Sequence, residues 1–197
     1  MYKIISNDII RQFQLCYYPS KLIRDENEEL SIKDWIQKYR DVVPAKDIVW
    51  LLLRKEFLSV KDLRLFAVWC AREALKLIEN PDKRSVEACN VAERYVNGEA
   101  TKEEFFSAYD AALAAVDISA YTVANHAYYA AYYAIAADTD YDPYYFTALA
   151  AVHYSSALAA RDTVSLANTN DAARAVAYDA RKIARTTQVD KLLTYFE

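Results

Sequence analysis

Glycine is almost missing from this chain, whose 197 residues include one glycine and four prolines. Hairpin turns and crossovers between strands and helices depend on glycine at positive φ, so a β-rich or α/β fold would lack the turns that it needs. Helices joined by short polar loops need few such residues, and alanine is abundant. The composition therefore predicts an all-α fold, in the form of a compact multi-helix bundle with short loops.

Basic residues are missing from the middle of the chain, where no Lys or Arg lies between Lys102 and Arg161. The formal net charge is −4 and the sequence pI is about 5.3. A surface that binds nucleic acid needs clustered cations that replace counterions along the phosphate backbone. We therefore expect no general binding of DNA or RNA.

Other absences concern the cellular location. No run of about 18 apolar residues is present, which predicts no spanning helix and no membrane partner. The first ten residues lack the apolar core and the cleavage site of a signal peptide. Cys16, Cys70 and Cys89 are odd in number, far apart and without a CxxC or Cys/His pattern, which is typical of reduced thiols. We therefore expect a cytoplasmic protein, in the bacterial host cytoplasm if a phage encodes it.

Capping residues mark where helices should begin and end. Ser31 and Ser59 are expected N-caps, and Pro44 is expected as the first residue of a helix. Gly98 suits the C′ position after a helix, and Thr101–Glu104 has the pattern of a capping box. With the apolar spacing, these signals predict helices over residues 7–16, 31–40, 44–58, 59–79, 85–97, 101–117, 120–137, 143–161 and 170–186.

Two parts are expected along the chain. Residues 1–43 should form an N-terminal helical extension packed on the body. Residues 44–197 should form an Ala- and Tyr-rich helical domain, in which the apolar segment 192–196 folds back onto the other helices. The chain length suits a single globular unit.

Alanines recur with coiled-coil spacing on two of the expected helices. They are separated alternately by four and three residues, which makes a seam of the smallest side chain that has a Cβ atom. Such seams predict close packing of the helix axes. The first seam is Ala120, Ala124, Ala127, Ala131 and Ala134, and the second is Ala173, Ala177, Ala180 and Ala184.

Tyrosines flank the first seam, and ten of the 17 lie between residues 105 and 161. One interpretation is a groove of aromatic faces and hydroxyls that binds a planar polar ligand or a partner protein. The other is that the rings hold neighbouring helices together and point their hydroxyls to water. The candidate ligand-binding residues here are His126, Tyr129, Tyr133, Tyr144, Tyr145, His153 and Tyr154.

A basic stripe follows on the last expected helix, where Arg174, Tyr178, Arg181 and Arg185 share one face. Three guanidinium groups could hold a phosphate or carboxylate, so we add these four residues to the candidate ligand site. The alternatives are a solvated face, or ion pairs with the acidic turn at residues 138–142.

No catalytic constellation is recognisable. Residues 138–142 (DTDYD) begin like a calcium loop, but Pro143 and Leu149 stand where an EF-hand needs Gly and Glu. His126 and His153 are the only histidines and lack the HxxxH spacing of a zinc pair, although two helices could bring them together. We therefore predict that the protein is not an enzyme and has neither a cofactor nor a metal site.

The stretch LRLFAVWCAREALKLIENPDKRSVEACNVAERYVNGEATKEEF, residues 63–105, resembles a family of small Ala-rich helical proteins of bacteria and phages. Further matching features are the segment PAKDIVWLLLRKEFL, the NPDKRS and NGEAT motifs, and a tail of Ala pairs with aromatics. The resemblance covers about residues 44–190. Members are often labelled immunity proteins, which implies a role in conflict between bacteria and phages but assigns no catalytic residues.

Three functions are compatible with these features. The first is a non-enzymatic, counter-defence or immunity-type binding protein that sequesters a small nucleotide-like ligand in the Tyr-rich groove. The second is a protein inhibitor or immunity factor that blocks a host or toxin protein through the acidic, Tyr-rich face of residues 103–160. The third is a structural phage component that forms homo-oligomers through exposed Ala seams.

Overall fold

The computed structural model describes residues 1–13, 28–117, 123–136, 143–163 and 170–196, and within these ranges the fold is all-α apart from one two-stranded sheet. Its elements are β1 (Ile4–Ile5), α1 (Asn7–Gln12), β2 (Leu30–Ser31), α2 (Ile32–Tyr39), α3 (Ala45–Leu52), α4 (Val60–Leu75), α5 (Lys83–Val96), α6 (Lys102–Asp117), α7 (Val123–Ala136), α8 (Pro143–Thr163) and α9 (Asn170–Leu193). Among the described helices, none is long and apolar enough to span a membrane.

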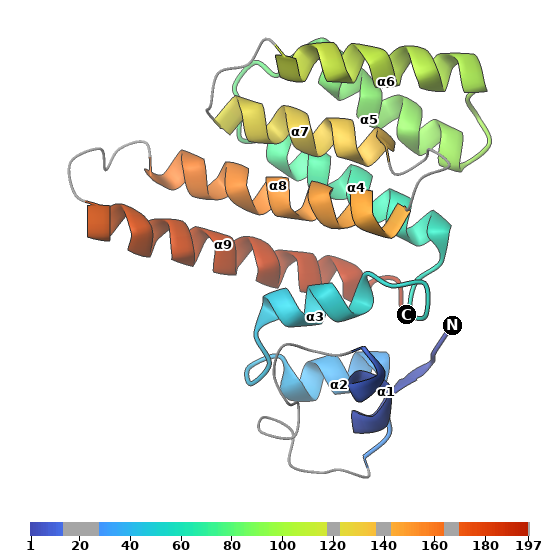
Figure 1. The fold of residues 1–197 in the computed structure, drawn as a ribbon, viewed down its shortest axis with the longest axis vertical. Coiled ribbons are helices and arrows are strands. Elements are labelled where there is room, and N and C mark those ends of the chain that lie inside the picture. Colours follow the sequence, from blue (N-terminus) through green and yellow to red (C-terminus); the bar gives the residue numbers. More distant parts are fainter. Residues whose placement is uncertain (14–27, 118–122, 137–142, 164–169, 197) are drawn as a thin grey trace.

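Helices α4 to α9 lie side by side in a bundle (Figure 1). Helix α8 packs on α4, α7 and α9, while α7 also packs on α4, α5 and α6. Helix α3 packs against α9, and α1 and α2 lie beyond α3 at the far end of the molecule (Figure 1). The pairing of α7 with α8 brings the Tyr-rich segments of the sequence together.

The N-terminal residues form the small sheet and two short helices. Strands β1 and β2 pair antiparallel, with Ile4 opposite Ser31 and Ile5 opposite Leu30. This sheet was not expected from the sequence, because two-residue strands carry no periodic pattern. The backbone N–H of Tyr2 donates to the carbonyl of Glu56, and Arg40 forms an ion pair of 2.7 Å with Asp190 of α9.

The predicted serine caps are confirmed. The hydroxyl oxygens of Ser31 and Ser59 accept the backbone N–H of Asp34 and Asp62, each at 3.1 Å. The capping box before α6 is also confirmed. There the Thr101 N–H donates to the Glu104 carboxylate at 2.8 Å, and the Glu104 N–H donates to the Thr101 hydroxyl at 3.2 Å.

The single glycine ends α5 as predicted. Gly98 has φ of +76°, in the left-handed region, and its N–H donates to the carbonyl of Tyr95 at 3.0 Å. The N–H of Glu99 donates to the carbonyl of Arg94 at 2.8 Å. These two bonds form a Schellman motif, which needs a residue with low cost at positive φ.

Several helix boundaries in the first half of the chain differ from the prediction. Helix α3 begins after Pro44, which is its N-cap, and ends at Leu52 rather than continuing to residue 58. The chain turns there, so that Phe57 and Leu58 are both buried. Helix α4 ends at Leu75, earlier than predicted, and α5 begins at Lys83 because the Asp82 carboxylate accepts the N–H of Arg84.

The last helix is longer than predicted. Helix α9 continues through Thr186 to Leu193. The prediction placed the end of this helix near residue 186, but Thr186 and Thr187 stay inside it and donate their hydroxyls to the carbonyls four residues earlier. The predicted turn at residues 138–142 and the end of the first predicted helix lie outside the described residues.

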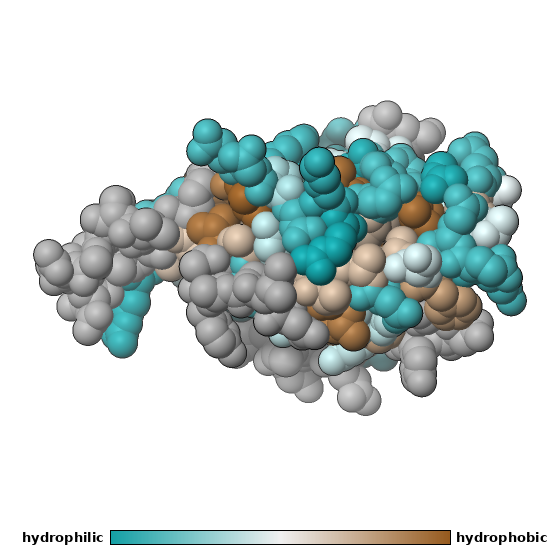
Figure 2. Space-filling view, turned by 90° about the horizontal axis from the view of Figure 1, so that it is seen from above, coloured by the Kyte–Doolittle hydropathy of each residue, from teal (hydrophilic) through white to brown (hydrophobic). Residues whose placement is uncertain are grey.

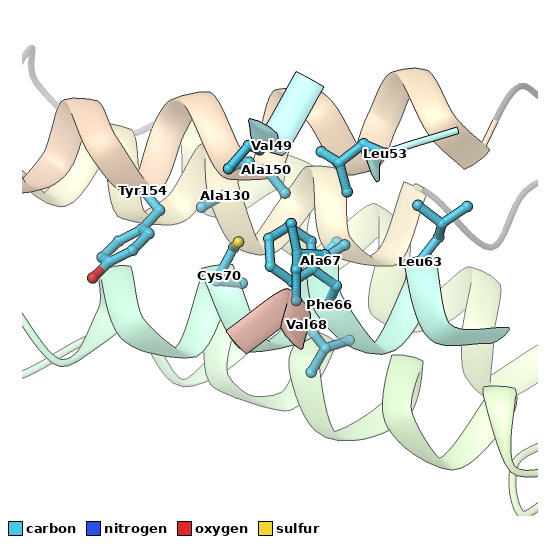
Figure 3. Close-up of a cluster of buried hydrophobic side chains, with 14 of the residues drawn as sticks. Val49, Leu53, Leu63, Phe66, Ala67, Val68, Cys70, Ala130, Ala150 and Tyr154 are labelled. Carbon is cyan, nitrogen blue, oxygen red and sulfur yellow. The ribbon is translucent and has the colours of Figure 1, made fainter. Parts of the chain in front are cut away.

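The Ala seams form the contact surfaces between helices. Ala127, Ala131 and Ala134 of α7 are completely buried, and so is Ala184 of α9. Phe66 of α4 is completely buried in the same core cluster as these alanines. Figure 3 shows Phe66 and Cys70 of α4 pointing toward the helices that carry Ala130 and Ala150. Within the described residues, the part of the first seam from Ala127 to Ala134 is therefore internal.

Candidate functional site

Five aromatic side chains gather where α7 lies beside α8. His126, Tyr129 and Tyr133 are spaced by three and four residues, so they project from one face of α7. Phe146 and His153 are seven residues apart and share one face of α8. We call these five residues the aromatic face. All five side chains are partly exposed, so the surface that they form reaches the solvent.

Apart from His126, the rings of the aromatic face are inclined to their neighbours by 19° to 36°. The His153 ring stacks on Tyr129 with 5.0 Å between centroids and 28° between planes, and lies 5.2 Å from the Tyr133 ring. Tyr129 and Tyr133 are 5.9 Å apart at 19°, and Phe146 stacks on Tyr133 at 6.1 Å and 24°. Such offset stacking fixes the orientation of each ring.

The two histidines of the chain meet within this face. The Nδ1 atoms of His126 and His153 are 3.4 Å apart, although the residues lie on different helices. Burial, with a smaller effect of the neighbouring His126, lowers the pKa of His153 to about 4. Burial also lowers the pKa of His126, and the positive charge of Arg181 adds to this effect. Both imidazoles are therefore neutral near pH 7.

One member of the predicted arginine stripe lies near the aromatic face. Arg181 of α9 is exposed and lies close enough to His126 to affect its pKa. Arg174 and Tyr178 are exposed on the preceding turns of α9, with Tyr178 69% accessible to solvent. They lie on the same side of the helix as Arg181.

Arg185 lies deeper than the rest of the stripe. Its guanidinium group donates to the side-chain oxygen of Gln188 at 3.0 Å, and burial lowers its pKa. Gln188 is buried and donates in turn to the carbonyl of Ala151 on α8 at 2.9 Å. Arg185 thus belongs to the contact between α8 and α9.

The other predicted tyrosines have separate positions. Tyr154 is 6% exposed and packs edge-on against Trp69 with 5.9 Å between centroids. Figure 3 shows its ring extending from α8 toward α4. Tyr145 is 59% exposed and contacts Phe146 edge-on at the end of the aromatic face. The side chain of Tyr144 lies outside the described part of the chain.

Phe146 is the member of the aromatic face that the sequence analysis missed. Its distance of seven residues from His153, two turns of the same helix, was the signal that could have found it. Two tyrosines on another face of α7, Tyr128 and Tyr132, have structural roles. The hydroxyl of Tyr128 accepts the backbone N–H of Asp82 at 3.1 Å, and the hydroxyls of Tyr132 and Tyr109 are 2.7 Å apart. Burial raises the pKa of Tyr132.

Hollows elsewhere on the described surface are lined by other residues. One, with a volume of about 540 Å³, lies where the two ends of the chain meet and is lined by Tyr2, Phe57, Tyr195 and Phe196 among others. Another lies between α5 and α6 and has charged walls that include Arg94 and Glu104. These two side chains form an ion pair of 3.1 Å.

Comparison with known proteins gives no match. No protein-family model, no curated protein and no solved structure is similar to this chain. The function must therefore be argued from the aromatic face itself.

Proposed function

We propose that this protein is a non-enzymatic binding protein that holds a small, planar, anionic ligand of the nucleotide class on its aromatic face. The observation that carries the proposal is the stack of Tyr129, Tyr133, Phe146 and His153 with the cation of Arg181 beside it. A stack of partly exposed rings fits a planar base, and a nearby guanidinium fits a phosphate.

The expected binding energy comes from stacking and one charge-assisted contact. Stacking of a base on an aromatic side chain contributes about 1–3 kcal/mol in nucleic-acid complexes. A guanidinium group can form two parallel hydrogen bonds with a phosphate. The neutral state of His126 and His153 supports the same assignment, because neutral imidazoles stack without burying a second charge.

The biological setting of the proposal is conflict between bacteria and phages. Its support is the resemblance of residues 63–105 to Ala-rich helical proteins of bacteria and phages. In that setting the protein sequesters a nucleotide signal and thereby lowers its free concentration. This part of the proposal rests on the resemblance, whereas ligand binding rests on the aromatic face.

Thermal unfolding against a panel of mononucleotides, cyclic nucleotides and ADP-ribose tests the binding. A ligand that binds only the folded protein, at a hundred times its Kd, should stabilise it by about 2.7 kcal/mol. We expect a higher melting temperature with at least one compound, and loss of this shift in Tyr129→Ala and in Arg181→Ala.

Matched controls separate binding from general destabilisation. Phe106→Ala removes an exposed ring on α6, and Lys182→Ala removes an exposed cation next to Arg181 in sequence. Both variants should keep the full shift. An unchanged melting temperature of the wild-type protein with every compound would contradict the proposal.

A second candidate function is inhibition of a basic partner protein, and a stripe on α6 favours it. Glu103, Phe106, Asp110 and Leu113 are exposed and spaced by three and four residues, so they share one face of the helix. Phe106 is 56% exposed and Leu113 is 38% exposed. Acidic residues around exposed apolar ones fit a partner of opposite charge. Figure 2 views the molecule from the α6 side, where apolar residues lie among hydrophilic ones.

The same variants distinguish the two candidates. A protein partner on α6 should be recovered from a host lysate by wild-type protein and by Tyr129→Ala, but not by Phe106→Ala. Because this recognition is electrostatic, capture should also weaken steeply as salt is raised. Capture that depends on Tyr129 and not on Phe106 would contradict the α6 surface.

A further inference from the structure

The histidine pair has a geometry that ligand stacking does not explain. The chain has two histidines, 27 residues apart, and the packing of α7 on α8 places their Nδ1 atoms 3.4 Å from each other. The rings are 5.5 Å apart between centroids and inclined by 43°, so they do not stack on each other in parallel. Instead, one nitrogen atom of each ring lies within hydrogen-bond distance of the other, between two partly exposed side chains.

The separation of the two nitrogens fits tetrahedral coordination of one ion. Zn–N bonds of about 2.0–2.1 Å at the tetrahedral angle place two coordinating nitrogens about 3.3–3.4 Å apart. Two adjacent nitrogens of a square-planar ion would lie closer, at about 2.9 Å. The observed 3.4 Å agrees with the tetrahedral value.

We propose that His126 and His153 bind one Zn²⁺ ion through their Nδ1 atoms, with the remaining coordination positions open to water or an anion. Within the described residues there is no group of three or more His, Cys, Asp and Glu side chains that could hold a metal. Among the described residues, the site therefore has two protein ligands. This inference does not depend on nucleotide binding, since it concerns the imidazole nitrogens alone.

The surroundings of the pair agree with a metal site that admits an anion. Tyr129 and Tyr133 hold the His153 ring by stacking, so little side-chain entropy is lost when the ion binds. Arg181 opposes a cation through its charge, but its side chain is exposed and can turn into solvent. With an anion on the open positions of the ion, the same guanidinium becomes favourable.

The competing explanation is a hydrogen bond in which one imidazole donates its Nδ1 proton to the other. It uses the same two atoms, so Zn²⁺ must displace that proton in order to bind. If the pair is a metal site, the protein binds added Zn²⁺. If it is only a hydrogen bond, the protein does not bind the ion.

Isothermal titration of tag-free protein, treated with EDTA and then dialysed, with ZnCl₂ at pH 7.5 tests the site. We expect one Zn²⁺ per chain with a Kd in the micromolar range. His126→Gln and His153→Gln should each weaken binding about tenfold or more, because each removes one of two protein ligands. Cys16→Ser and Tyr129→Phe are the controls, and both should bind Zn²⁺ like the wild type.

Cobalt reports the coordination geometry of the bound ion, which the titration does not measure. Co²⁺ bound to the pair should show the intense visible absorption of a tetrahedral ion, and ZnCl₂ should remove it. Far-UV circular dichroism shows whether the glutamine variants keep their helices. A wild-type protein that releases no heat with Zn²⁺, or glutamine variants that are folded and bind it equally well, would overturn the proposal.

Discussion

At the scale of single residues, the histidine pair links the site to pH. The pKa of His153 in the folded protein is about 4, below the usual value of 6.5 that the unfolded chain should have. Its neighbours are His126, Tyr129 and Tyr133 on α7, with Arg181 of α9 close to His126. Of these, His126 also has a lowered pKa, so both imidazoles favour the neutral form in the fold.

The stability of the protein should therefore fall as the pH decreases below about 6.5. Between pH 6.5 and 4 the unfolded chain binds more protons than the folded one, so unfolding is favoured by falling pH. The full stabilisation is present above pH 6.5, and the loss should be about 1–3 kcal/mol for His153. Urea unfolding at pH 7.5 and 5.0, in the presence of a chelator, measures it. His153→Gln should show a smaller difference between the two pH values, and an equal difference would contradict the assignment.

Gly98 is the residue at which backbone conformation should dominate the effect of a mutation. A Cβ atom built there meets no atom within 4 Å, so the cost of a side chain is conformational rather than steric crowding. Gly98→Ala should destabilise the protein by about 1 kcal/mol, because alanine at positive φ is strained. Gly98→Asn should lose less, since asparagine tolerates this region better. Equal melting temperatures of the alanine variant and the wild type would contradict the expectation.

At the scale of helices and their contacts, the Ala seam of α7 sets how closely the bundle packs. Ala127 is completely buried, so Ala127→Leu must force side chains or helix axes apart. We expect a loss of about 1–3 kcal/mol in the free energy of unfolding. Ala114→Leu, at an exposed position of α6, is the control and should change stability by less than about 0.5 kcal/mol. A size measurement should show the same oligomeric state for both variants, because the seam lies inside one chain.

The sequence predicted those elements that are specified by local interactions. Ser59, Gly98 and the pair Thr101 and Glu104 act on atoms within a few residues, so their sequence pattern alone indicated where helices begin and end. The end of α9 was missed because Gln188 and Leu192 are held by contacts with distant helices. Likewise, heptad spacing gave the common face of His126, Tyr129 and Tyr133, but only the packing of α7 on α8 brings His153 to them.

The candidate site was predictable to the same limited extent. Tyr154 is one residue from His153, so its side chain leaves α8 in another direction and contacts Trp69 of α4. Arg185 is one turn from Arg181, and there α9 lies deeper against α8. The spacing along the sequence could not show that Tyr154 and Arg185 lie apart from the candidate site. The surroundings of each side chain depend on which other helices pack against its own helix.

At the scale of the whole molecule, one question is whether residues 1–43 form a unit that can unfold independently. The buried apolar side chains form one cluster that extends from Ile5 through the bundle to Leu192. The ion pair between Arg40 and Asp190 joins the same two regions at the surface. A continuous core of this kind favours a single cooperative unfolding transition.

Tryptophan fluorescence can test this prediction, because the three tryptophans lie in different elements. Trp35 is buried in α2 and reports on the N-terminal region, whereas Trp69 lies in α4 and reports on the bundle. Two variants that each keep one of these residues, with the other tryptophans replaced by Phe, should unfold at the same urea concentration as judged by circular dichroism and by fluorescence. An earlier transition for Trp35 alone would show that α2 opens before the bundle. The N-terminal region would then be an extension that docks on the body rather than a part of its core.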